Sequence, residues 1–324
     1  MTAPGKPALL VAIDTEGDNQ WDADARRHQR FDNIYALGRL HEFFTRHGVR
    51  PTYVITYPVA SDARSAETLR SLLARGDCEI GAHHHAWETP PFDPNDVDRH
   101  PYASSLPLER FDKQLLILTD AIDAAVGRRP VSYRSGRFGF SARHVSSLER
   151  AGYLIESSVA PLFYEKHKGG PDFVGAPLTP YYLAYDDATK SGSSGLLELP
   201  ISAALSRRVP GWLERWYGRA PSPYTTRRIL RLLRIAHVRW LRPSYSSAED
   251  MMALARQIVD RGAPMLNLLF HSSEAIVGGS PYNRTESELN GFFDRLGRFF
   301  EYASRELRVE PRTFAEFRRT YTRQ

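Results

Sequence analysis

The 324-residue chain contains a single cysteine, Cys78, so it cannot form an intrachain disulfide. It also lacks any run of about 18 consecutive apolar residues, the length that a transmembrane helix requires. Its first residues, Met1 to Pro7, do not show the charged and then apolar pattern of a secretory signal. These absences are typical of a reducing compartment, and we expect a cytoplasmic protein, with peripheral contact to the inner membrane as an open possibility.

Internal repeats, low-complexity tracts and nucleic-acid-binding motifs are also missing, so we expect no nucleic-acid partner. Hydrophobic residues make up 42% of the chain and charged residues 25%, as in an ordinary folded protein with a sizeable core. The net charge of +5 suits an acidic or phosphate-bearing partner.

Short apolar runs alternate with helical patterns along the chain. Residues 8–13 are apolar throughout, which favours a strand buried on both faces of a parallel sheet. We expect further strands at 51–56, 78–82, 130–134, 153–158, 196–201 and 265–270, and helices at 33–47, 65–75, 108–126, 141–151 (capped by Ser141), 246–261 and 285–307. This order predicts an α/β fold with a closed or nearly closed barrel, and an open doubly wound sheet is the competing architecture. No linker divides the chain, so we expect one domain, 1–324, with an insertion at about 203–245 before the last barrel strand.

Polar and ionisable residues follow several of these strands. Asp14, Glu16 and Asp18 follow the first strand, three consecutive histidines at 83–85 follow the third, Arg134 ends the fourth and His271 ends the last. Parallel barrels place their chemistry at this end of the strands. Side chains alternate along a strand, so His83 and His85 should point to one side and His84 to the other. Two imidazoles and one further ligand would hold a metal ion with an open position for water.

Five segments in this order resemble the motifs of the polysaccharide deacetylase family (carbohydrate esterase family four, the NodB homology domain). They are Asp14-Thr15-Glu16-Gly17-Asp18, Gly81-Ala82-His83-His84-His85, Tyr133-Arg134-Ser135-Gly136-Arg137-Phe138-Gly139, Glu156-Ser157-Ser158 and Phe270-His271-Ser272. The set is most similar to a divergent branch with Asp-Thr-Glu-Gly-Asp, His-x-His-x-Trp and Phe-His-Ser-Ser signatures, often found near exopolysaccharide or lipopolysaccharide biosynthesis genes. The third motif departs from the common pattern by lacking its prolines, and the fourth by beginning with Glu156 instead of aspartate.

The resemblance implies a distorted (β/α)7-type barrel, a divalent metal that is most often Zn2+, and hydrolysis of an N- or O-acetyl group on a sugar or glycan intermediate of cell-surface polysaccharide biosynthesis. It makes Asp14 the general base and Glu16 the metal carboxylate, with Asp18 as the alternative. The common second motif places its histidines four residues apart, but Trp87 occupies that place here. We therefore expect His83 and His85 to be the metal ligands, and His84 is the alternative to His85.

The remaining roles follow from acid–base chemistry. His271, as an imidazolium, would protonate the leaving group, and Arg134 would orient Asp14 and keep it ionised. Trp87, Arg137 and Phe138 are candidate substrate-binding residues, although Trp87 could instead only pack beside the site. The alternative function is a metal-dependent amidohydrolase acting on a small cyclic or linear amide, of the allantoinase or imidase kind. A non-catalytic carbohydrate-binding relative is a third possibility, disfavoured by the intact Asp14 and His271.

The predicted insertion is rich in arginine and aromatic residues. It contains ten arginines and a single acidic residue, interleaved with tryptophan, tyrosine and leucine. This composition indicates either helices that flank the barrel with a solvated basic face, or an interfacial surface that brings the enzyme to a lipid-linked or anionic glycan. Elsewhere we expect Cys78 to be a buried strand residue. Glu198 and Asn267 are polar strand residues to which the sequence assigns no role.

Overall fold

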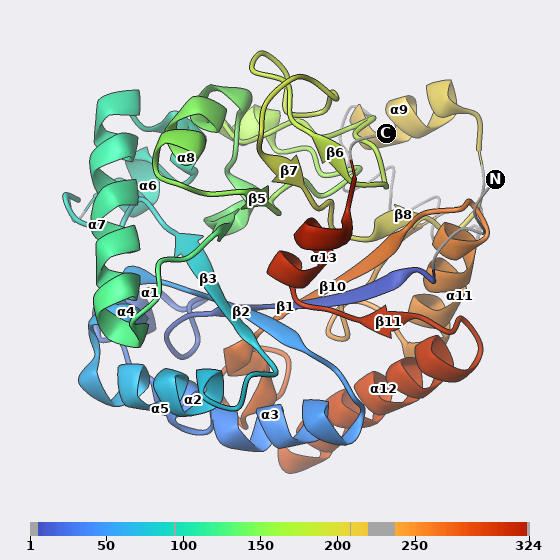
Figure 1. Ribbon diagram of the computed structural model, residues 1–324, viewed down its shortest axis with the longest axis horizontal. Helices are drawn as coiled ribbons and strands as arrows, with labels where there is room; N and C mark the ends of the chain where they lie inside the picture. The colour runs from blue at the N-terminus through green and yellow to red at the C-terminus, as the bar shows by residue number, and fades with distance from the viewer. Residues whose placement is uncertain (1–5, 94, 208, 220–236, 323–324) are drawn as a thin grey trace.

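The computed structural model describes residues 6–93, 95–207, 209–219 and 237–322. Its centre is a strongly curled sheet of seven parallel strands, in the spatial order β10, β1, β2, β3, β4, β5 and β7 (Figure 1). Their bounds are Met265–His271, Ala8–Thr15, Pro51–Ile55, Glu79–His84, Ser132–Ser135, Ile155–Glu156 and Leu197–Glu198. The short antiparallel β6 (Tyr181–Tyr182) borders β7, and β11 (Glu310–Pro311) pairs with β1. This is the distorted (β/α)7-type barrel that the sequence predicts.

Helices surround the outside of the sheet (Figure 1). The longer ones are α3 (Leu37–Arg46), α5 (Ala63–Leu73), α7 (Leu108–Val126), α11 (Ala248–Val259) and α12 (Glu286–Arg305). The others are α1 (Ala23–Arg27), α2 (Asp32–Tyr35), α4 (Tyr57–Ser61), α6 (Asp96–Arg99), α8 (Val145–Arg150) and α13 (Phe314–Thr320), with single 3-10 turns at 103–105, 136–138, 142–144, 166–168 and 272–275. Their apolar faces pack with the strands into one large buried cluster.

The gap between β7 and β10 is bridged by backbone from both ends of the insertion. The Ser202 amide donates to the Asn267 carbonyl (3.1 Å), and the Leu241 amide donates to the Ser202 carbonyl (2.9 Å). The Leu269 amide in turn donates to the Leu241 carbonyl (3.0 Å). The barrel is therefore nearly closed, although its two edge strands do not pair directly with each other.

Several predicted elements differ in detail. The helix expected at 33–47 is divided into α2 and α3, because Ala36 leaves helical geometry between them. The strands expected at 153–158 and 196–201 pair over only two residues each. Ser141 precedes a 3-10 turn but makes no side-chain cap, so that prediction was wrong. The C-terminal α13, which the sequence analysis missed, lies over the amino-terminal ends of the strands, where the Ala315 amide donates to the Glu79 carboxylate (2.7 Å).

The insertion contains a small antiparallel pair, β8 (Ala203–Leu205) and β9 (Val238–Trp240), and the helix α9 (Gly211–Arg219). Residue 208 and residues 220–236 of its predicted basic stretch lie outside the described residues. Among the residues that the structure describes, no helix has the length and apolarity needed to cross a membrane.

Candidate active site

The strand register brings the predicted site residues together at the carboxyl ends of neighbouring strands. Asp14 of β1 is the register partner of His271 of β10, and His83 of β3 is the partner of Arg134 of β4. All four side chains are largely or fully buried. The curl of the sheet turns these two pairs toward one another, so that Arg134 reaches Asp14.

Arg134 holds Asp14 in a buried ion pair. Its Nη1 donates to Asp14 Oδ1 at 2.7 Å, while its Nε donates to the Ser157 carbonyl (2.7 Å) and its Nη2 to the Ser157 hydroxyl (3.0 Å). Burial alone would raise the pKa of Asp14, but Arg134, assisted by His83 and His271, lowers that pKa well below its usual range. Asp14 is therefore ionised at neutral pH, with its second oxygen, Oδ2, not engaged by Arg134.

Glu16, His83 and His85 form a group that could hold a metal ion. One ligand atom from each lies within 4.8 Å of the others, and all three side chains are buried. Burial lowers the pKa of His83 to about 4 and that of His85 to about 3, so both rings are neutral at pH 7 and keep a lone pair for a metal. The Nδ1 atoms of both rings are buried without a hydrogen-bond partner. Two neutral imidazoles and a carboxylate fit a zinc-type site.

The two alternative ligands point elsewhere. The Asp18 carboxylate accepts hydrogen bonds from the backbone amides of Asp32 and Asn33, both at 3.0 Å, so it caps α2. His84 Nε2 lies 2.8 Å from Gln114 Oε1 of α7, on the opposite face of β3 from His83 and His85. Neither side chain belongs to the group formed by Glu16, His83 and His85.

His271 is held by a buried acidic residue that the sequence analysis missed. Its Nδ1 lies 2.9 Å from Glu274 Oε1, and its Nε2 lies 3.1 Å from Glu16 Oε1 and 3.9 Å from Asp14 Oδ2. Burial lowers the pKa of His271, but the hydrogen bond to Glu274 and the charge of Glu16 outweigh it and raise the pKa. Arg242, from the end of the insertion, donates to Glu274 at 2.8 Å.

Arg242 and His271 keep the Glu274 carboxylate negatively charged. Burial would raise its pKa, but Arg242 and His271 lower the pKa to about 2, so Glu274 is an anion at neutral pH. The only sequence signal for Glu274 was its place three residues after His271, in a short helical turn. Arg242 lies 32 positions before its partner, and nothing in the sequence distinguished it from the other arginines of the insertion.

Two of the three candidate substrate-binding residues, Trp87 and Arg137, lie beside His85, while Phe138 packs against Phe163 and Trp240. The Arg137 guanidinium lies 4.4 Å from the centre of the Trp87 ring, and Trp87 lies 4.2 Å from His85. Arg137 and Phe138 both have positive φ (53° and 57°), a backbone conformation that non-glycine residues rarely adopt and that is found preferentially at functional sites. A Cβ added to Gly136 would clash with the His85 ring, so this glycine lets the third motif pack against the second.

On the His271 side, a row of partly exposed aromatic rings continues the border. Trp21 lies 4.9 Å from His271 and 5.4 Å from Tyr282, which contacts Tyr245 at 5.9 Å. Trp240 then lies 6.2 Å from both Tyr245 and Phe138. We call Trp21, Tyr282, Tyr245, Trp240 and Phe138 the aromatic border. Four of its members come from loops or from β9, and Phe138 alone was predicted from the sequence to bind substrate.

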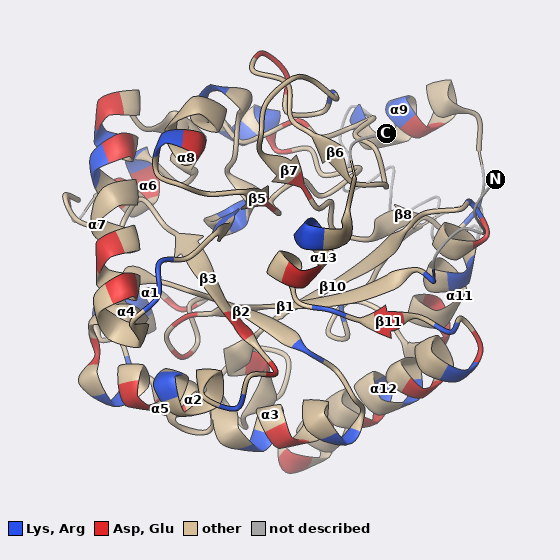
Figure 2. Ribbon diagram, viewed as in Figure 1, with Lys and Arg blue, Asp and Glu red and all other residues tan. Residues whose placement is uncertain are grey.

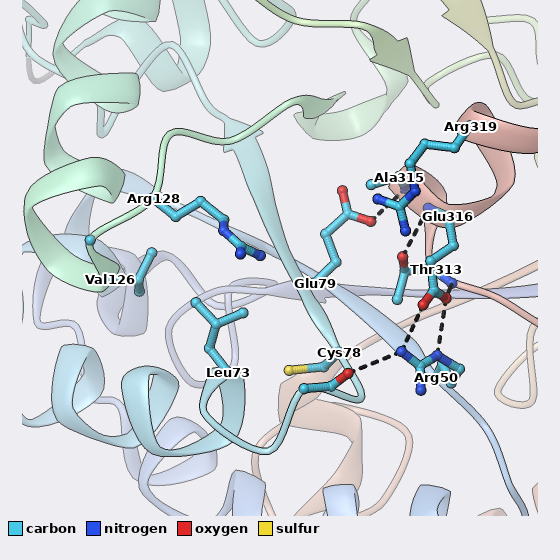
Figure 3. A pocket seen from close by; sticks show the side chains of 12 residues that line it. Arg50, Leu73, Cys78, Glu79, Val126, Arg128, Thr313, Ala315, Glu316 and Arg319 are labelled. Carbon is cyan, nitrogen blue, oxygen red and sulfur yellow. Dashed lines mark hydrogen bonds and ion pairs between the residues drawn. The ribbon is translucent and has the colours of Figure 1, made fainter.

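A cavity of about 510 Å³ lies at the opposite, amino-terminal ends of the strands. Figure 3 shows Arg50, Cys78, Glu79, Arg128 and Arg319 around it. Cys78 is buried, as expected, and burial raises the pKa of its thiol to about 12. None of the proposed site residues lines this cavity, and the amino-terminal end of such a barrel generally serves stability.

Comparison with known proteins identifies the fold. No family profile matches the sequence, and no curated protein matches it. Among solved structures, a Mycobacterium smegmatis protein described as a polysaccharide deacetylase superposes with a TM-score of 0.58 at 18% identity, over 100% of this chain and 97% of the other. A Parabacteroides distasonis protein described as a glycoside hydrolase/deacetylase gives 0.64 at 14% identity, over 99% and 74%. The 4-alpha-glucanotransferase of Thermococcus litoralis gives 0.52 at 13% identity, over 98% of this chain but 41% of the enzyme. The chain has the NodB-type barrel fold of the polysaccharide deacetylases.

Proposed function

We propose that the protein is a metal-dependent deacetylase that removes an acetyl group from an N- or O-acetylated sugar. One observation carries the proposal: an ionised carboxylate, Asp14, and a histidine of raised pKa, His271, both lie against the group Glu16, His83 and His85. A base, an acid and a metal-binding group within a few ångströms are what amide or ester hydrolysis requires. Because the fold is shared with a glucanotransferase, the proposal depends on these residues and not on the fold.

Glu16, His83 and His85 would hold the ion, and their nitrogen and oxygen ligands favour Zn2+. Such an ion supplies Lewis acidity toward the acetyl carbonyl and lowers the pKa of water. The protein contributes two pre-formed neutral imidazoles and a carboxylate. Since burial keeps both imidazoles unprotonated, their ligand nitrogens need not lose a proton before binding at neutral pH.

Asp14 would act as the general base. Its Oδ1 accepts a hydrogen bond from Arg134, which fixes the carboxylate and keeps it charged, while Oδ2 lies 3.9 Å from His271 Nε2. The carboxylate takes a proton from the attacking water as the new C–O bond forms at the acetyl carbon. Arg134 is a positioning residue, because its other hydrogen bonds tie it to the carbonyl and the hydroxyl of Ser157.

His271 would act as the general acid. Glu274 accepts from Nδ1 and stabilises the imidazolium, so the proton on Nε2 is directed toward Glu16 and Asp14. When the tetrahedral carbon collapses, the bond to the sugar nitrogen or oxygen breaks and Nε2 protonates the departing atom. The products are acetate and a free amine or hydroxyl on the sugar.

The substrate would lie against the aromatic side chains that surround the candidate site. Trp87 and Arg137 border the site beside His85, and the aromatic border extends from Phe138 to Trp21, which lies beside His271. Flat aromatic rings stack on the apolar faces of pyranose rings, so this arrangement favours a sugar over a small imide or ureide. A glycan intermediate of cell-surface polysaccharide biosynthesis is the substrate class we propose.

An acetate-release screen of the Zn2+-loaded protein against N- and O-acetylated mono- and oligosaccharides tests the proposal. We expect Asp14→Asn and His271→Ala each to abolish turnover while the protein still binds the metal, because neither residue is in the proposed ligand group. Ring opening of imides or ureides without acetate release would instead establish the amidohydrolase alternative. Full activity of either variant on the responsive substrate would refute the assigned roles.

A further inference from the structure

Helix α9 faces the solvent with its aromatic side. Trp212 is 66% exposed and Trp216 is 48% exposed, and they lie one helical turn apart with Arg215 and Arg219 on the same face. The opposite side of the helix is the one that packs: Tyr217 joins a small buried cluster with Leu162 and Leu205. The core contact of α9 is therefore satisfied without either tryptophan.

Two adjacent exposed tryptophans on one helix face indicate an interaction surface. If these tryptophans only stabilised the fold, we would expect their large side chains to point inward, where burial stabilises the protein most. At Gly218 a Cβ would come within 2.6 Å of Val174, so the inner face of α9 is closely packed and could not accommodate them by rotating the helix. The orientation of α9 is thus set by its inner contacts, and the tryptophans are presented outward.

A partner that binds this face of α9 must be compatible with the positive charge of the insertion. The stretch 203–245 contains ten arginines and one acidic residue. Five of these arginines are among the residues that the structure describes. Arg219 pairs with Asp172, Arg239 with Asp250 and Arg242 with Glu274, while Arg207 beside α9 and Arg215 on it are exposed. Figure 2 shows arginine on α9, which lies at the outer edge of the molecule. An anionic surface would neutralise this charge.

We propose that α9 docks the protein onto an anionic phospholipid surface, with the helix axis parallel to the bilayer. A projecting helix with tryptophan and arginine on one face suits a plane, because indole rings favour the headgroup region and arginines bind lipid phosphates. The same insertion reaches the candidate site, since β9 carries Trp240 and the residues after it include Arg242, which contacts Glu274. This inference does not depend on the deacetylase proposal.

Co-sedimentation with vesicles tests the proposal. The full chain is mixed at low salt with vesicles of equal parts phosphatidylcholine and phosphatidylglycerol, or of phosphatidylcholine alone. We expect binding to the anionic vesicles only, a blue shift of tryptophan fluorescence, and release at high salt. The double variant Trp212→Ala/Trp216→Ala should bind about tenfold more weakly or not at all, and Arg215→Glu should shift release to lower salt.

A matched control removes exposed apolar side chains elsewhere. Leu116 on α7 and Tyr185 are 53% and 48% exposed, and Leu116→Ala/Tyr185→Ala should bind like the wild type. Circular dichroism confirms that each variant is folded. No binding of the wild type at low salt, or equal binding by the α9 double variant, would overturn the proposal. So would concentration-dependent dimerisation that the α9 variant abolishes without any vesicle binding, since the face would then serve a second copy.

Discussion

Replacing Glu274 with glutamine tests how the structure prepares His271 for acid catalysis. In the wild type, the fully buried Glu274 carboxylate lies 2.9 Å from His271 Nδ1 and 2.8 Å from Arg242 Nη2. Glutamine keeps the size and one acceptor oxygen but removes the charge. A hydrogen bond to a charged group contributes about 1.5–3 kcal/mol, so the imidazolium should lose stabilisation of that order and the pKa of His271 should fall. We expect turnover to decrease about ten- to a hundredfold.

The same substitution leaves Arg242 buried without its anion. Breaking a buried ion pair costs about 3–5 kcal/mol of stability, which denaturant unfolding can measure. The double variant Glu274→Gln/Arg242→Met removes both charges and should recover much of that stability. Arg242 Nη2 also lies 3.1 Å from His271 Nδ1, and its charge lowers the pKa of His271. The double variant should therefore recover part of the turnover but not all of it, because the anion beside His271 is still missing.

Titration of His271 by NMR in the metal-free protein and the pH profile of acetate release are the two readouts. The variant's alkaline limb should move to lower pH, since a proton held less tightly is lost earlier as the pH rises. An unchanged His271 pKa and wild-type turnover in Glu274→Gln would refute the reasoning. So would full recovery of turnover in the double variant, because turnover would then not need an anion beside His271.

Two further substitutions test other parts of the structure. Gly136→Ala should weaken metal binding without unfolding the barrel, because the added Cβ would displace the His85 ring. An unchanged metal affinity, measured by calorimetry, would contradict the close packing of Gly136 against His85. Burial and the neighbouring Glu156 raise the pKa of Glu198 well above 4.5. The folded state therefore keeps a proton that the unfolded state loses. As a result, the free energy of unfolding falls as the pH rises above 4.5, by up to about 1.4 kcal/mol per pH unit. Glu198→Gln should remove this slope, and its stability advantage over the wild type, measured by urea unfolding, should be larger at pH 8 than at pH 5.

Elements with strong local signals could be predicted from the sequence. The helix α7 has the predicted bounds, because its apolar residues recur at helical spacing and Gly127 adopts a left-handed conformation directly after it. The buried β1 follows from its apolar run, and the alternation of side chains in β3 explains why His84 faces α7. The barrel followed from the order of these elements together with the family resemblance.

Features that depend on long-range contacts could not be predicted. The choice between Glu16 and Asp18 depends on the path of the loop after β1, where Asp18 turns to cap α2. Glu274 and Arg242 meet only because the insertion returns to the barrel between β7 and β10. The pairing of β5 and β7 over only two residues is likewise shorter than their apolar sequences indicated.

Metal content tests the central claim most directly. The purified protein, loaded with Zn2+ and dialysed, should retain the metal, and Glu16→Ala, His83→Ala and His85→Ala should each lose it. The matched controls Asp18→Asn and His84→Gln should retain the metal, because the Asp18 side chain caps α2 and the His84 side chain contacts Gln114. Retention of metal by the first three variants, or its loss from the two controls alone, would contradict the assignment of Glu16, His83 and His85 as the metal-binding group.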